Sequence, residues 1–131
     1  MEIKSFSFRY IVNNVPEAIK FYTGPLGFKV EMNPNEHFAI LSKQGLRLML
    51  STPSGPGGGS QPARDNRIPE PGGWNRIQLQ VEDIDKTIDE LQKSNIHFRT
   101  QLVKGIGAKQ VIIEDPSGNP VEVDELIQQR K

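Results

Sequence analysis

Cysteine is absent from this chain of 131 residues, which excludes disulfides, thiolate metal ligands and catalysis by a cysteine nucleophile. Long apolar runs are also missing, so no segment is expected to cross a bilayer, and the N-terminal residues lack the apolar core of a signal peptide. An excess of charge is missing too, because 16 basic residues balance 16 acidic ones. We therefore expect a cytoplasmic protein whose overall charge attracts neither nucleic acid nor a membrane.

The sequence does contain one pattern that occurs twice. The stretch that begins at Ser7 reads S-F-R-Y-I-V-N-N-V-P-E-A-I-K-F-Y, and the stretch that begins at Arg76 reads R-I-Q-L-Q-V-E-D-I-D-K-T-I-D-E-L. Each copy combines the alternation of a strand, a polar residue that can cap a helix (Asn14 or Asp83), and an amphipathic helix. The chain length suits one domain or two small fused modules.

Three more strands follow in each copy, as alternating apolar residues and turn residues indicate. They are predicted near residues 28–32, 37–42 and 45–51, and near residues 96–100, 108–114 and 120–126. Each half therefore has the order strand, helix and three strands, βαβββ, which predicts an α+β fold of two modules, one over about residues 1–52 and the other over about residues 74–131.

Proline and glycine dominate residues 53–73, which we interpret as the linker between the modules. Its Gly-Pro-Gly-Gly-Gly run at 55–59 lacks the ending of a P-loop and does not open a helix, so nucleotide binding is not predicted. A flexible tether is favoured over an ordered lid above a binding site, and both interpretations stay open. The two histidines, His37 and His97, lack metal-ligand spacing and are predicted to be surface residues.

Polar residues gather on one face of the predicted strands. The apolar residues that alternate with them must pack against the helices, so the polar face is expected to line a concave surface. Two interpretations stay open: a solvated sheet with ordinary ion pairs, or a pocket in which arginines hold a polar or anionic small molecule. The residues on this face are Ser7, Arg9, Arg47, Met49, Arg76, Gln78, Glu122 and Asp124.

Three stretches of the chain resemble the vicinal oxygen chelate superfamily, which includes glyoxalase I, extradiol dioxygenases, fosfomycin-resistance enzymes and bleomycin-resistance proteins. They are A-I-K-F-Y-T-G-P-L-G-F at 18–28, V-E-D-I-D at 81–85 and E-D-P-S-G-N-P-V-E-V at 114–123. The resemblance implies that both modules have curled mixed sheets, that these sheets form a concave cleft, and that the protein is a homodimer.

Catalytic members of that superfamily hold a divalent metal on cleft-facing residues of four equivalent strands. The resemblance places Ser7, Met49, Arg76 and Glu122 at those positions. Glu122 alone is a conventional ligand, since a guanidinium is a permanent cation that only donates hydrogen bonds. We therefore expect no metal and no other cofactor, and we predict that Arg76 takes the place of the metal and pairs with Glu122. A divalent metal bound through Glu122 is the alternative.

The resemblance implies two functions, and the sequence leaves open whether the protein is an enzyme. The first is a metal-free binding protein, in which Arg9, Arg47, Ser7, Gln78 and the Arg76–Glu122 pair contact a polar or anionic small molecule while Trp74 and Met49 add apolar surface. The second is a lyase or isomerase resembling glyoxalase, with Glu122 as catalytic base or metal ligand. The missing histidines disfavour metal-dependent glyoxalase I and dioxygenase chemistry.

Overall fold

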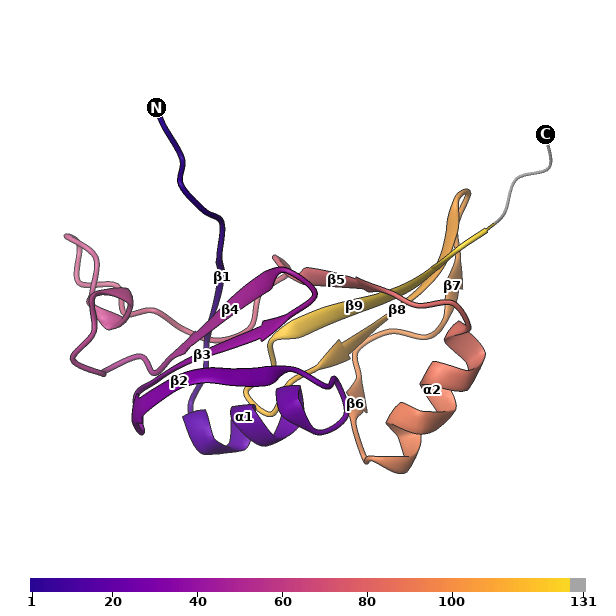
Figure 1. The fold of residues 1–131 in the computed structure, drawn as a ribbon, viewed down its shortest axis with the longest axis horizontal. Coiled ribbons are helices and arrows are strands. Elements are labelled where there is room, and N and C mark those ends of the chain that lie inside the picture. Colours follow the sequence, from indigo (N-terminus) through magenta and orange to yellow (C-terminus); the bar gives the residue numbers. More distant parts are fainter. Residues whose placement is uncertain (128–131) are drawn as a thin grey trace. The chain divides into compact units, whose positions relative to one another are not determined.

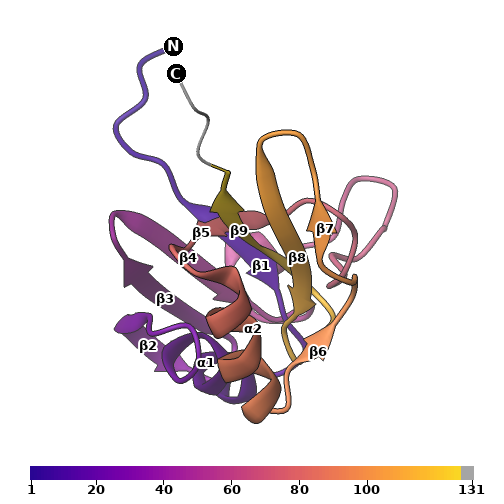
Figure 2. The ribbon, with the colours of Figure 1, turned by 90° about the vertical axis from the view of Figure 1, so that its right-hand side faces the viewer.

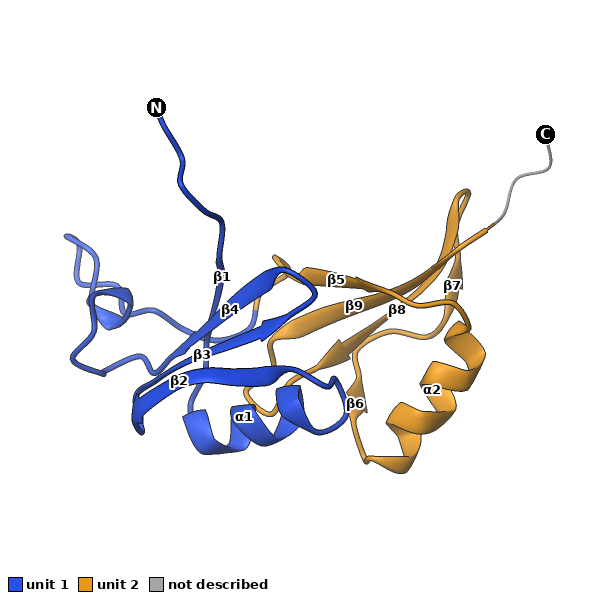
Figure 3. Cartoon of the chain, in the orientation of Figure 1, with its two compact units in different colours: residues 1–72 blue, residues 73–131 orange. Residues whose placement is uncertain are grey.

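The computed structural model describes residues 1–127. The chain divides into two compact units, Met1–Gly72 and Gly73–Lys131 (Figure 3). The boundary falls at the end of the segment that the sequence analysis interprets as a linker, so residues 53–72 belong with the first unit. Neither α-helix within residues 1–127 has the length and apolar character needed to cross a membrane.

The first unit is a four-stranded sheet with one α-helix against it (Figure 1). The strand order is β1-β4-β3-β2, with β1 parallel to β4 and the other pairs antiparallel. The predicted βαβββ order is confirmed here. The elements are β1 (Phe8–Ile11), α1 (Val15–Thr23), β2 (Lys29–Asn35), β3 (Phe38–Lys43), β4 (Leu46–Ser51) and the short 3-10 helix η1 (Gly58–Ser60).

The sequence signals at the ends of α1 are confirmed. The Asn14 side chain accepts a hydrogen bond from the main-chain N–H of Glu17 at 2.9 Å, and Gly24 forms the C-cap. Tyr22 is fully buried, with its ring centroid 5.9 Å from that of Tyr10 and 5.8 Å from that of Phe28. Aromatic packing of this kind holds the helix against the sheet.

Strand β1 is shorter than the predicted strand over residues 5–12. Its ladder with β4 begins at the pair Phe8 and Leu48, and Phe6 is 81% exposed. In this register Ser7 and Phe6 would lie opposite Arg47 and Leu46. Both Ser7 and Phe6 are exposed, so extending the ladder would bury little surface. Ser7 lies outside the strand.

The second unit repeats the βαβββ order and adds one short strand. Its order is β5-β9-β8-β6, with β5 parallel to β9, while β7 also pairs with β8 (Figure 2). Strands β8 and β9 match their predicted ranges, whereas the predicted strand over 96–100 is reduced to β6. The elements are β5 (Ile77–Gln80), α2 (Ile84–Lys93), β6 (His97–Phe98), β7 (Val103–Lys104), β8 (Ala108–Glu114) and β9 (Pro120–Leu126).

Two local motifs position the polar face of this sheet. Asp83 caps α2 by accepting from the N–H of Lys86 at 3.0 Å, as predicted. The turn between β8 and β9 is held by Asp115, whose side chain accepts from the N–H groups of Ser117 and Asn119, each at 2.9 Å. Gly118 supplies the positive φ, +84°, that this turn requires. The turn fixes the register of β9, and with it the positions of the carboxylates that follow.

Candidate functional site

The candidate site in the second unit lies on the polar face of β5 and β9. Gln78 pairs with Glu122 and Gln80 with Asp124 along the parallel ladder. Because side chains two positions apart on a strand share a face, Gln78, Glu122 and Asp124 project to the same side of the sheet. Arg76 immediately precedes β5 and reaches the same carboxylates.

Arg76 and Glu122 form the predicted ion pair. The Nε and Nη2 atoms of Arg76 lie 2.8 and 2.6 Å from Oε1 of Glu122, and Nη1 donates to the main-chain oxygen of Trp74 at 2.9 Å. The Glu122 side chain is 10% exposed and that of Arg76 27% exposed. Charge-assisted hydrogen bonds at these distances hold the guanidinium in one orientation and neutralise its charge.

Gln78 joins this pair to a second carboxyl group. Its Nε2 donates to Oε2 of Glu122 at 2.9 Å and also contacts Oδ2 of Asp124. Asp124 is only 3% exposed, and its Oδ1 has no hydrogen-bond partner within residues 1–127. The sequence analysis placed Asp124 on this face but left it out of the candidate site. The signal that could have included it is the alternation itself, since Asp124 follows Glu122 by two positions.

The two carboxyl groups have pKa values shifted in opposite directions. Burial raises the pKa of Asp124, the hydrogen bond and negative charge of Glu122 raise it further, and it reaches about 6 although Gln78 and Arg76 act against the shift. Burial also raises the pKa of Glu122, but hydrogen bonds from Asp124, Gln78 and Arg76 outweigh that effect and hold it below its usual value. The pair therefore keeps Glu122 ionised and holds a proton on Asp124 in mildly acidic solution.

The residues at the four positions where the family resemblance implies a metal do not suit a divalent ion. Oε1 of Glu122 accepts from Arg76 and Oε2 accepts from Gln78, so both oxygens already have donors. Ser7 and Met49 offer a hydroxyl and a thioether, which are poor ligands for such ions. In the part of the chain that the structure describes, no three histidine or carboxylate side chains are grouped to hold a metal ion.

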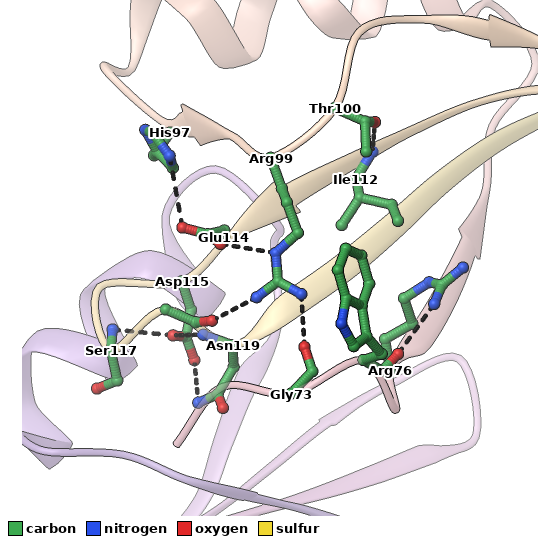
Figure 4. Close-up of polar contacts among 12 residues, drawn as sticks. Gly73, Arg76, His97, Arg99, Thr100, Ile112, Glu114, Asp115, Ser117 and Asn119 are labelled. Carbon is green, nitrogen blue, oxygen red and sulfur yellow. Dashed lines mark hydrogen bonds and ion pairs between the residues drawn. The ribbon is translucent and has the colours of Figure 1, made fainter. Parts of the chain in front are cut away.

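A second polar network, around Arg99, adjoins Trp74 (Figure 4). The Arg99 Nε donates to Oε2 of Glu114 at 2.7 Å, Nη2 donates to the main-chain oxygen of Gly118 at 2.8 Å, and Nη1 donates to that of Gly73. The guanidinium carbon lies 4.6 Å from the centroid of the Trp74 ring, which is a cation–π contact. Sequence reasoning missed Arg99, because nothing local marks a residue whose partners come from two distant segments, the β8–β9 turn region and the residues before β5.

Trp74 and His97 lie at the edges of this network. Trp74 is 64% exposed and precedes β5, so it presents an aromatic surface to solvent. The His97 side chain is 74% exposed, with Nε2 3.5 Å from Oε1 of Glu114, which confirms its predicted surface position.

The remaining predicted site residues belong to the first unit, and the structure brings two of them together. Arg9 and Met49 are direct partners in the β1–β4 ladder, and Nη2 of Arg9 lies 3.6 Å from the Met49 sulfur. Arg47 lies on the same strand and face as Met49 but opposite Ser42, and it is exposed. Ser7, outside β1, has no part in either group.

A pocket of about 360 Å³ opens beside Arg9. Its wall includes the β2–β3 turn, the end of β4 and the glycine-rich segment that contains η1. His37 contributes to it from the turn, and its Nδ1 lies 3.0 Å from Oγ1 of Thr52. The His37 side chain is 37% exposed, so this histidine is partly accessible to solvent and also lines the pocket. The lining residues are Arg9, Pro34, Asn35, His37, Phe38, Ser51, Pro56, Gly57, Gly58, Gly59 and Ser60.

Comparisons with known proteins agree on one family. The family model described as Glyoxalase/Bleomycin resistance protein/Dioxygenase superfamily matches residues 4–123. Among solved structures, a member of that superfamily from Sphaerobacter thermophilus DSM 20745 is 26% identical, with a TM-score of 0.72 over 95% of this chain and 99% of the other. No significant match was found among curated proteins.

Two further structures show the same fold at lower identity. Lactoylglutathione lyase from Agrobacterium tumefaciens is 20% identical, with a TM-score of 0.71 over 95% of this chain and 96% of the other. An antibiotic-binding protein from Streptomyces sp. CB03234 is 17% identical, with a TM-score of 0.70 over 97% of this chain and 99% of the other. One is named as an enzyme and the other as a binding protein, so the fold alone does not decide between these functions.

Proposed function

Since the chain belongs to the Glyoxalase/Bleomycin resistance protein/Dioxygenase superfamily, we propose that it binds a polar or anionic small molecule without a metal cofactor. The observation that carries the proposal is the ion pair between Arg76 and Glu122, with distances of 2.6 and 2.8 Å. A guanidinium paired with Glu122 takes the place that the family resemblance gives to an exchangeable metal cation in catalytic members. In this pair the Glu122 carboxylate, which a metal would need as a ligand, already accepts hydrogen bonds from Arg76.

The side chains around this pair suit recognition of a polar molecule. Gln78 offers an exposed amide group, and Trp74 offers an exposed aromatic face for an apolar part of the ligand. The likeness to an antibiotic-binding protein supports the same proposal. In this function the protein sequesters or senses its ligand and does not convert it.

The test is ligand binding by protein from which metal has been removed with a chelating resin. We expect some members of a panel of small carboxylates, phosphates and polar aromatic compounds to raise the melting temperature of metal-stripped protein, with no further rise when zinc, nickel or manganese is restored. Arg76→Gln should weaken this binding, because it leaves Glu122 unpaired. Binding that requires an added divalent ion would contradict the proposal.

A second candidate function is a metal-independent lyase or isomerase reaction. The observation that favours it is Asp124, a carboxyl group that is almost fully buried and has a pKa of about 6, as a proton-transfer residue needs. Glu122, the base that the sequence analysis named, is a weaker candidate because its pKa is lowered. Turnover of a methylglyoxal–thiol adduct by metal-stripped protein, lost in Asp124→Asn, would support this reaction over simple binding.

We also propose that the protein works in the cytoplasm as a homodimer. The cytoplasmic location is inferred from the composition of the chain. The homodimer is inferred from the family resemblance, since members of the superfamily commonly complete their clefts by pairing modules within or between chains.

A further inference from the structure

Arg9 is exposed and has no carboxylate partner among the described residues, unlike the more buried Arg76 and Arg99. Arg76 has Glu122 and Arg99 has Glu114 as ion-pair partners. Within the described residues, the hydrogen bond of Arg9 goes to the sulfur of Met49 at 3.6 Å. A thioether is a weak acceptor with no charge, so the guanidinium keeps most of its donors and its full positive charge.

The pocket beside Arg9 contains polar groups but no carboxylate. Ser51 and Ser60 are 3% and 4% exposed, and both line this pocket. The hydrogen bonds of the described residues use neither hydroxyl, and neither oxygen is an unsatisfied atom cut off from solvent, so both can donate to a molecule in the pocket. Together with the Arg9 guanidinium, these two hydroxyls give the pocket hydrogen-bond donors from three separate segments.

The glycine-rich segment passes close to the Arg9 guanidinium. A Cβ atom on Gly59 would occupy the same space as that guanidinium. The φ of Gly59 lies outside the left-handed region, so the backbone itself does not require glycine there. Because the guanidinium is the end of a flexible side chain, a larger residue at this position would displace the arginine from its present place. Residues 53–72, which the sequence analysis interprets chiefly as a flexible tether, form one wall of the pocket.

We propose that this pocket binds an oxyanion, a phosphate or carboxylate group, through the guanidinium of Arg9 and the hydroxyls of Ser51 and Ser60. Planar arginine donors match the geometry of both groups. The inference goes beyond the proposed function, because it assigns an oxyanion site to the first unit alone and does not depend on the Arg76–Glu122 pair of the second unit.

The test is titration of the protein with inorganic phosphate and, separately, with acetate, followed by two-dimensional amide NMR at constant ionic strength. We expect saturable shifts at residues 35–38 and 57–60. Arg9→Gln should weaken the binding by about tenfold or more, because a charge-assisted contact is lost. Gly59→Ala should also weaken it, since the added methyl group displaces the guanidinium. Tighter binding of phosphate or of acetate identifies which oxyanion the pocket prefers.

Arg64→Gln is the matched control, because it removes the same charge from an exposed position of the same unit outside the pocket. We expect it to bind phosphate as the unchanged protein does. Unaltered binding in Arg9→Gln, or equal weakening in Arg64→Gln, would overturn the oxyanion site. The two proposals can fail separately. If the protein contains one metal ion per chain but still requires Arg9 to bind phosphate, the proposed metal-free function is contradicted and the oxyanion site is supported.

Discussion

Asp124 and Glu122 give the second unit opposite dependences of stability on pH. The pKa of Asp124 is raised from 3.8 to about 6, so the folded protein binds more protons than the unfolded protein between these values. Its contribution to stability is therefore present at low pH and is lost as the pH rises through this range. Glu122 has a lowered pKa, so its contribution is present above its usual value of 4.5 and is lost as the pH falls below it.

Replacing Asp124 with asparagine should stabilise the protein in alkaline solution. Asparagine cannot ionise, so the penalty of a buried charge beside Glu122 disappears, while its side-chain oxygen can still accept from Gln78. We expect the free energy of unfolding to rise by about 1–2 kcal/mol near pH 8 and to change little near pH 4. Urea denaturation at both pH values measures this, with the exposed Asp89→Asn as control. An equal change at both pH values would contradict the account.

Residues on regular strands were the predictable part of the site. Strand alternation placed Arg76, Gln78 and Glu122 on one face, and the family resemblance, by assigning Arg76 and Glu122 to metal positions, led to the prediction that these two residues pair. The same strand alternation also placed Asp124 on this face. Arg99 could not be predicted, because its partners Glu114, Gly118 and Gly73 become neighbours only through the tertiary fold.

At the scale of elements, Arg99 joins the short strand β6 to the β8–β9 turn and to the residues before β5. Its side chain is 16% exposed and bonded to Glu114 and two main-chain oxygens. Arg99→Gln should lower the free energy of unfolding by about 2–4 kcal/mol, because Glu114 loses its partner and the carbonyl groups lose donors. Urea denaturation tests this, and Arg64→Gln, which removes an exposed arginine, should have little effect.

Arg99→Lys distinguishes geometry from charge in the same network. A lysine keeps the positive charge but cannot reach three acceptors with a planar fork, so we expect it to recover only a small part of the lost stability. Full recovery with lysine would show that charge alone holds these elements together.

The elements were predictable in proportion to their length and the clarity of their ends. The helices have polar caps, Asn14 and Asp83, that mark where they begin. Strands β8 and β9 are long and flank a turn with strong sequence signals, and valine and acidic residues alternate in β9 after Pro120. Strands β6 and β7 have two residues each, too few to show any period, and their existence depends on the edge that β8 offers them.

At the scale of the whole molecule, the duplication in the sequence predicted the βαβββ order of both units, and the resemblance predicted the family. The ligand could not be predicted in the same way, because this fold serves enzymes and binding proteins alike. The role of the glycine-rich segment could not be predicted either. Its composition favoured a flexible tether, whereas the closeness of Gly59 to Arg9 arises only in the folded chain.

The expected assembly is a homodimer. We expect sedimentation velocity to give the mass of two chains at protein concentrations of about 10 μM, and we expect the dimer to dissociate only when it is diluted. A single species with the mass of one chain at all accessible concentrations would contradict this expectation, although it would leave the Arg76–Glu122 pair and the oxyanion pocket unchanged.

The most direct measurement is the metal content of the protein, determined by elemental analysis after dialysis against nickel, zinc, manganese and iron in turn and removal of free ions. Because Arg76 and Gln78 already satisfy both oxygens of Glu122, the account predicts that each metal remains far below one ion per chain. One ion per chain, lost when Glu122 is replaced by glutamine, would contradict it.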